Sequence, residues 1–252
     1  MRKKLLCGNW KMNKTPLEAK QFALDSIAPI EHAVKNNIDV GIAPTYLCLD
    51  ALKTNASSSL IVFAQNVHYL ESGAYTGEVS ASMLSSINVD GALIGHSERR
   101  TYDNETSSKC NLKIKALLNK NLIPLYCVGE TEKEFVDGIT YQVIENQLVE
   151  GLKDLSKEQM EKVIIAYEPV WSIGTGKNAS QEIAENVCAF IRKKVEELYP
   201  STSENVRILY GGSVKPNNIK GYLSQENVDG ALVGGASLTV QSFSEMIDAL
   251  LS

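Results

Sequence analysis

The segment IIAYEPVW at residues 164–171 places a carboxylate, Glu168, directly after a short apolar run and directly before Pro169. The run does not alternate between apolar and polar residues, and continuous apolar runs are typical of strands buried on both faces, as in a parallel sheet. Pro169 fixes the direction of the chain beyond the carboxylate. The segment therefore predicts a buried parallel strand that ends at a partly desolvated carboxylate.

Runs of this kind recur along the chain, and there are eight of them. They cover residues 5–7, 40–43, 60–64, 92–94, 123–128, 163–167, 206–210 and 231–233. Helical patterns lie between them, and strands that alternate with helices predict parallel βαβ units. With no linker or low-complexity segment in 252 residues, the sequence predicts an α/β fold, a single-domain (β/α)8 barrel over residues 1–252, with an open doubly wound sheet as the alternative.

Local signals mark three of the expected helices. Residues 15–18 (TPLE) combine a capping box with proline at the first helical position. Residues 181–198 place their apolar side chains on one face at helical spacing. Ser242 and Glu245 have the spacing of a second capping box, which predicts that the last helix begins there.

Composition excludes several classes of protein. The net charge of −5, with no clustered basic segment, argues against a nucleic-acid partner. No stretch approaches the roughly 18 apolar residues of a membrane span, so we expect no membrane partner and a cytoplasmic location. The five cysteines are scattered without a C-x-x-C pair, and the three histidines are isolated. Free thiols and no metal site are therefore expected.

Four side chains at the ends of predicted strands are candidates for chemistry, because the loops after the strands carry the active site in such barrels. Asn9 and Lys11 follow the first run, His96 the fourth and Glu168 the sixth. Burial should raise the pKa of Glu168 and make it a usable general base. At a helix N-terminus, His96 should stay neutral and could pass a proton between oxygens. Lys11 and Asn9 could hold an anion and stabilise developing negative charge.

Three glycine-rich turns could bind phosphate through their backbone N–H groups. They lie at residues 173–177, 210–213 and 233–236, and the last two follow the last two strands, as in the phosphate site common in these barrels. Ser237 and Leu238 could form a short helix whose N-terminus faces the anion. Neither a Walker A sequence nor a G-x-G-x-x-G turn is present, which argues against a nucleotide. For His32 and His68 we favour ordinary structural roles.

Together these segments resemble the triosephosphate isomerase family almost from end to end. The matching motifs are GNWKMN (8–13), AQN (64–66), YTGEVS (75–80), IGHSERR (94–100), CVGE (127–130), AYEPVWSIGTG (166–176), ILYGGSVKP (208–216) and DGALVGGASL (229–238). The resemblance implies an enzyme of glycolysis and gluconeogenesis that needs no metal or organic cofactor. Its reaction would interconvert dihydroxyacetone phosphate and glyceraldehyde 3-phosphate through an enediolate.

The resemblance also implies roles for individual residues. Glu168 would carry the proton between two carbons, a neutral His96 would serve the oxygens, and Lys11 and Asn9 would hold the substrate. The phosphate would be bound by the backbone amides of Gly174, Ser213, Gly234 and Gly235. Residues 169–178 would form a lid that excludes water.

The resemblance further implies a homodimer in which the loop at residues 73–78 inserts into the partner and Thr76 supports the partner's site. The sequence departs from the family at residues 103–105, where Asp-Asn-Glu replaces the usual Phe-Gly-Glu, and at Ser172, where alanine is common. Asn104 tolerates left-handed backbone better than most residues. The lid's second hinge, at residues 177–179, reads Lys-Asn-Ala. Another phosphosugar barrel enzyme and a catalytically silent barrel are the alternatives.

Overall fold

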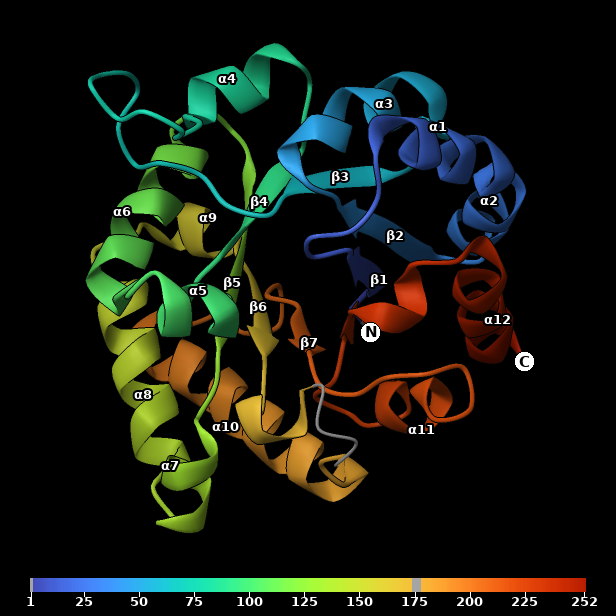
Figure 1. The fold of residues 1–252 in the computed structure, drawn as a ribbon. Coiled ribbons are helices and arrows are strands. Elements are labelled where there is room, and N and C mark those ends of the chain that lie inside the picture. The colour runs from blue at the N-terminus through green and yellow to red at the C-terminus, as the bar shows by residue number, and fades with distance from the viewer. Residues whose placement is uncertain (1, 174–177) are drawn as a thin grey trace.

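Eight parallel strands close into one barrel in chain order in the computed structural model, which describes residues 2–173 and 178–252 (Figure 1). The strands are β1 (Lys4–Asn9), β2 (Ile38–Ala43), β3 (Ile61–Ala64), β4 (Gly91–Ile94), β5 (Ile123–Val128), β6 (Ile164–Tyr167), β7 (Ile208–Tyr210) and β8 (Gly230–Val233). The pairing of β1 with both β2 and β8 removes the free edges of the sheet. All eight apolar runs coincide with strands, and the predicted barrel is confirmed over the open sheet.

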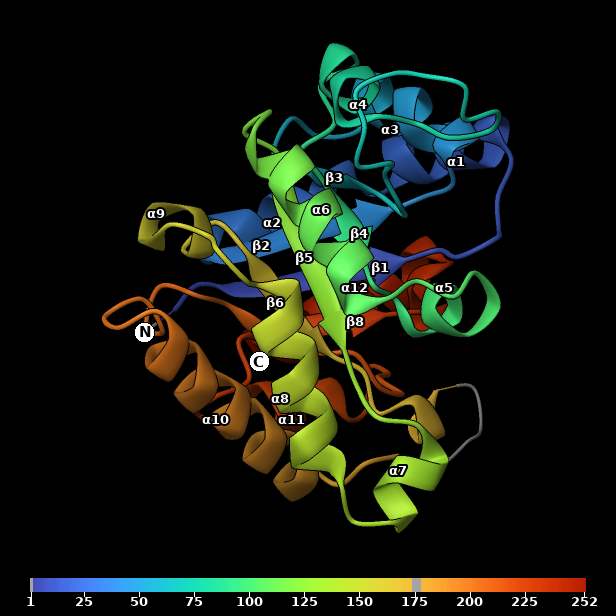
Figure 2. The same ribbon diagram turned by 90° about the vertical axis from the view of Figure 1, so that its left-hand side faces the viewer.

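The helices lie outside the strands (Figures 1 and 2). The α-helices are α1 (Pro16–Asp25), α2 (Ile27–Lys35), α3 (Leu49–Asn55), α4 (Ala81–Ser86), α5 (Ser97–Tyr102), α6 (Ser107–Leu118), α7 (Glu132–Val136), α8 (Thr140–Gly151), α9 (Lys157–Met160), α10 (Gln181–Leu198), α11 (Ile219–Leu223) and α12 (Val240–Leu251). The short 3-10 helices are η1 (Tyr46–Cys48), η2 (Val170–Ser172) and η3 (Gly235–Ser237).

Two of the three predicted helix signals are confirmed. The capping box at Thr15 opens α1, and α10 has the predicted bounds. The predicted start of the last helix was wrong: the N-cap of α12 is Thr239, three residues before Ser242, and the Thr239 hydroxyl accepts the N–H of Ser242 at 3.2 Å. Thr239 has extended backbone angles, as an N-cap requires, whereas Ser242 is already inside the helix.

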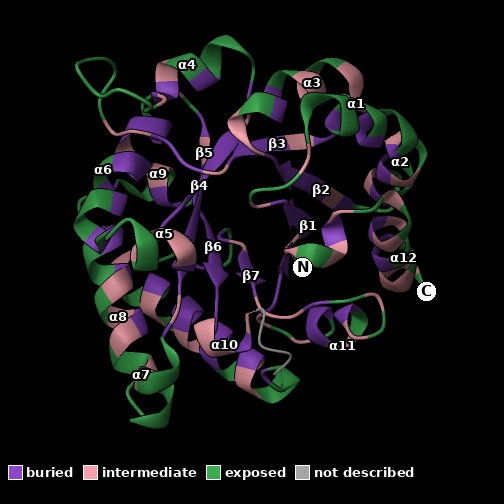
Figure 3. Ribbon diagram, viewed as in Figure 1, coloured by how far each residue is buried: buried purple, intermediate pink, exposed green. Residues whose placement is uncertain are grey.

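Side chains of each strand alternate between two apolar layers. Leu5 and Cys7 point into the barrel interior, where they join residues such as Phe63 and Leu125. Leu6 points outward into the larger layer beneath the helices. Figure 3 shows the result, with buried residues on the strands and exposed residues on the outer faces of the helices. Burial on both faces explains why the strands read as continuous apolar runs.

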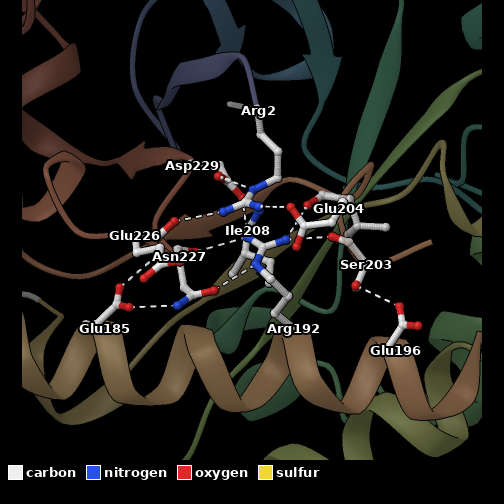
Figure 4. Close-up of polar contacts among 11 residues, drawn as sticks. Arg2, Glu185, Arg192, Glu196, Ser203, Glu204, Ile208, Glu226, Asn227 and Asp229 are labelled. Carbon is white, nitrogen blue, oxygen red and sulfur yellow. Dashed lines mark hydrogen bonds and ion pairs between the residues drawn. The ribbon is translucent and has the colours of Figure 1, made fainter. Parts of the chain in front are cut away.

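A buried polar network closes the end of the barrel at which the strands begin (Figure 4). Asp229, which precedes β8, accepts hydrogen bonds from Arg192 of α10 at 2.5 Å, from Arg2 at 2.7 Å and from the backbone N–H of Ile208 at 2.9 Å. Arg192 also donates to the carbonyl of Ser203 at 2.7 Å. This network ties the longest described helix to three strands and leaves the other end of the barrel for the site.

Candidate active site

The four candidate side chains come together at the carboxyl ends of the strands. Asn9 ends β1, and His96 and Glu168 lie just beyond β4 and β6. All three, together with Lys11, line one cavity of about 330 Å³. This volume is within the range of small-molecule sites. The structure therefore places an amide, an ammonium, an imidazole and a carboxylate around a single space.

Glu168 and His96 are in direct contact. His96 Nε2 lies 2.9 Å from Glu168 Oε1, and both side chains are buried. The backbone N–H of Ser97, in the first turn of α5, donates to Glu168 Oε2 at 3.1 Å. The N–H of Glu98 donates to His96 Nδ1 at 3.2 Å, which assigns the proton of the neutral ring to Nε2, facing Glu168.

The prediction of a raised Glu168 pKa was wrong for this arrangement. Burial raises the pKa of Glu168, but the nearby His96 and the Ser97 N–H outweigh burial and lower it below its ordinary value. For the same reason the pKa of His96 is raised: burial lowers it, and the adjacent Glu168 carboxylate outweighs that effect. His96 does cap the N-terminus of α5, which was expected to keep the ring neutral. The Glu168 carboxylate, 2.9 Å from Nε2, favours the protonated ring instead.

This pair predicts a pH-dependent contribution to stability. Because the pKa of His96 is raised, its contribution is fully present below about pH 6.5 and is lost as pH rises through the raised pKa. Because the pKa of Glu168 is lowered, its contribution is present above about pH 4.5 and is lost as pH falls through the lowered pKa. His96→Gln should therefore lower Tm more at pH 5.5 than at pH 8.5. Equal losses at both pH values, measured beside the exposed His32→Gln, would contradict the coupling.

Lys11 is fixed by its neighbours in an uncommon backbone conformation. Its φ is +53°, in the left-handed region, which is uncommon outside glycine and is often found at functional sites. Its N–H donates to Asn9 Oδ1 at 3.0 Å, and Gln65 Nε2 donates to its carbonyl at 2.8 Å. Its ammonium pairs with Glu98 at 2.6 Å. Our sequence reasoning gave no role to Gln65 or Glu98, although both lie in motifs that carried the resemblance.

The glycine-rich turns after β7 and β8 line the same cavity. Ser213, Gly234 and Gly235 all border it. Within residues 2–173 and 178–252, no acceptor is bound by the backbone N–H groups of these three residues. A short helix is present, but not where it was expected: η3 covers Gly235–Ser237, and Leu238 is its C-cap and not part of it. Gly174, also predicted to bind phosphate, lies outside the described residues.

The glycine at position 211 is required by the closeness of the base. A Cβ at Gly211 would lie 2.8 Å from Glu168 Cγ. The described part of the expected lid, residues 169–173, contains η2, where Trp171 donates to Glu130 at 2.8 Å. The rest of the lid up to Lys177 lies outside the described residues.

The two departures from the family motifs have local explanations. Asn104 has φ +51°, a left-handed conformation that asparagine tolerates better than most residues. The following Glu105 still accepts the N–H of Gly95 at 2.8 Å, directly before His96. The extra hydroxyl of Ser172 donates to the carbonyl of Pro169 at 3.0 Å, so this buried group is satisfied. The described residues hold no cluster of three His, Cys, Asp or Glu side chains that could bind a metal ion.

An eight-stranded parallel barrel with a carboxylate, an imidazole and an ammonium at the carboxyl ends of its strands defines the class of (β/α)8-barrel enzymes that work by acid–base chemistry. The family model described as triosephosphate isomerase matches residues 4–250. The chain belongs to the triosephosphate isomerase family, and it is an isomerase.

Curated relatives agree with the family match. Proteins named triosephosphate isomerase from Clostridium botulinum (strain Okra / Type B1) and Clostridium beijerinckii are 48% and 47% identical to the chain. One from Clostridium perfringens (strain SM101 / Type A) is 45% identical. Each alignment covers 98% of this chain and 100% of the relative.

Proposed function

We propose that the chain interconverts dihydroxyacetone phosphate and glyceraldehyde 3-phosphate, as the name of its relatives suggests. The observation that carries the proposal is the cavity itself. Its lining combines Glu168, His96 and Lys11 with the turns after β7 and β8, where the backbone N–H groups of Ser213 and Gly235 bind no acceptor among the described residues. A small substrate with a reacting carbonyl at one end and a phosphate at the other matches these two sets of groups.

The first chemical step would be proton abstraction by Glu168. The carboxylate takes a proton from the carbon next to the carbonyl, the C–H electron pair forms a C=C bond, and the carbonyl oxygen becomes an enediolate oxygen. The Nε2–H of His96 and the Lys11 ammonium would stabilise that oxygen, with the Asn9 amide beside them. Return of the proton to the neighbouring carbon completes the isomerisation, while His96 passes a proton between the two oxygens.

Glu168 must leave its present partners before it can act. In this structure its carboxylate is bound by the Ser97 N–H and by His96. When it turns toward the substrate carbon, it loses the donors that lower its pKa, and burial then raises that pKa toward the working range of a base. His96 loses its neighbouring anion at the same time, so the neutral ring is favoured in the step where it must donate.

A coupled assay on the unmodified chain tests the function directly. Glyceraldehyde 3-phosphate is supplied, and the appearance of dihydroxyacetone phosphate is followed through reduction by a dehydrogenase. Turnover that is fast relative to the uncatalysed reaction is expected with no added metal and no cofactor other than the NADH that the coupling dehydrogenase oxidises. A folded protein without turnover would favour the silent barrel.

Lys11→Met is expected to weaken binding of inorganic phosphate and of glycerol phosphate by about 10- to 100-fold. This is the effect of losing one charged hydrogen bond of about 1.5–3 kcal/mol. Calorimetric titration of both ligands provides the measurement. Lys133→Met on exposed α7 is the matched control, because Lys133 pairs with Asp137 away from the cavity. Equal affinity in Lys11→Met and the unmodified chain would remove Lys11 from the site.

The proposal includes a homodimer built around the loop at residues 73–78. Met12, Leu47 and Tyr102 are large apolar side chains with exposed fractions of 92%, 79% and 78%. Met12 and Tyr102 border a second cavity, which His96 and Lys11 also line, so a partner's Thr76 inserted there would reach the site. Light scattering should give about twice the 27.6 kDa mass of one chain. A mass near 27.6 kDa would contradict the dimer.

We also propose a cytoplasmic location. All five cysteines are free and buried, as suits a reducing compartment. None of the helices in the described ranges is both long and apolar enough to cross a membrane.

A further inference from the structure

Gln147 of α8 binds both backbone groups of a single residue at the end of β5. Its Oε1 accepts the N–H of Gly129 at 2.8 Å, and its Nε2 donates to the carbonyl of Gly129 at 2.9 Å. The backbone carbonyl of Gln147 accepts a hydrogen bond from the hydroxyl of Tyr126, in β5, at 2.7 Å. Three hydrogen bonds thus connect this point of the outer helix layer (Figure 2) to the end of β5.

Gly129 in turn lies directly against the backbone of Glu168. A Cβ at Gly129 would lie 1.8 Å from the Glu168 carbonyl oxygen, so the two backbones approach as closely as glycine allows. The Glu168 N–H donates to the carbonyl of Val128 at 2.8 Å, and the Val170 N–H donates to the carbonyl of Glu130 at 3.1 Å. Residues 128–130 therefore support the backbone from which the Glu168 side chain projects.

Packing alone does not fix this support. A cavity of about 180 Å³ lies beside it, lined by Gly129, Gln147, Ser97 and Glu168 among others. Gly129 and Gln147 therefore have no protein atoms packed against the side that faces this space. The two hydrogen bonds from the Gln147 amide hold Gly129 at the edge of this space, while Gly129 also packs against the backbone of Glu168.

We propose that Gln147 is a positioning residue for the base, which acts by holding Gly129 and through it the backbone of Glu168. The inference rests on the proposed function, in which Glu168 removes a proton from carbon. Proton transfer is sensitive to position, and a misplacement of about 1 Å costs about 100-fold in rate. Gln147 is not among the described residues that line the main cavity.

Gln147→Met is expected to lower kcat by about 10- to 100-fold and to change KM by less than about threefold. Methionine keeps the length of the side chain but neither binds the Gly129 N–H nor donates to its carbonyl. Gln142→Met is the matched control on the same helix, because the exposed Gln142 pairs with Asn146 and not with the barrel. It should leave both constants unchanged.

Gln147→Glu adds a readout that a purely structural role would not produce. Ionised, the new carboxylate can still accept the Gly129 N–H but repels the Gly129 carbonyl. Protonated, it can donate to that carbonyl as glutamine does. The ratio of kcat for this variant to that of the unmodified chain should therefore rise as pH falls from 8 to 5.5.

Combination with Glu168→Asp identifies the residue through which Gln147 acts. Once the carboxylate has been retracted, Gln147→Met should cost less than it does in the unmodified chain, because the two changes damage the same geometry. The inference is overturned if Gln147→Met lowers Tm but leaves kcat unchanged, or if the two kcat losses simply multiply. An unmodified chain without activity would instead overturn the proposed function, and the inference with it.

Discussion

Glu168→Gln is expected to lower kcat by roughly 10²- to 10⁴-fold, the contribution typical of a positioned general base. Glutamine has nearly the shape of glutamate and can still accept from the Ser97 N–H, which now donates to the carboxylate at 3.1 Å. It cannot take up a proton from carbon. KM should change far less than kcat, because the lost interaction belongs to the transition state. The coupled assay measures both constants.

Two further variants separate the carboxylate's charge from its position. Glu168→Asp keeps the charge but retracts the carboxylate by one methylene, so kcat should again fall strongly, with less effect on binding. Glu161→Gln is the control, since exposed Glu161 accepts a hydrogen bond from Asn205 and neither residue lines the cavity. If Glu168→Gln kept the kcat of the unmodified chain, Glu168 would not be the base.

The barrel could be predicted from the sequence because every strand must be apolar on both of its faces. Leu5 and Cys7 face the interior while Leu6 faces the helices, so both faces must be apolar and the run is continuous. The last helix shows the limit of such patterns. Ser242 has the right spacing to Glu245, but Thr239 has the extended backbone of a cap, and side-chain spacing in the sequence does not reveal backbone angles.

The site residues could be selected from the sequence, whereas their electrostatics could not. His96 and Glu168 each follow a predicted strand, so both could be placed at the carboxyl end of the barrel. The 2.9 Å contact between them, which reverses the expected pKa shift of Glu168, depends on side-chain rotamers. The positive φ of Lys11 is equally hidden, because a lysine carries no local preference for left-handed backbone. Gln147 gave no signal at all, since its partner is backbone and not a side chain.

Asp229→Ala is expected to lower the free energy of unfolding by about 3–5 kcal/mol, the cost of breaking a buried ion pair from one side. Asp229 is 1% exposed and is bound by Arg192, Arg2 and the N–H of Ile208. Its removal leaves the Arg192 guanidinium buried with carbonyl partners but without an anion. Urea unfolding at one fixed protein concentration measures the loss, because association would otherwise contribute to the apparent stability.

The same network predicts that the loss of stability in Asp229→Ala depends on Arg192. Arg192→Met removes the buried cation, so the double variant should lose much less than the sum of the single losses. Asp137→Ala is the control, since its exposed pair with Lys133 is worth about 0.3–0.5 kcal/mol. Additive losses at Asp229 and Arg192 would mean that each residue stabilises the barrel through separate neighbours. Because this network lies at the opposite end from Glu168, Asp229→Ala should leave kcat of the folded protein unchanged at temperatures well below its Tm.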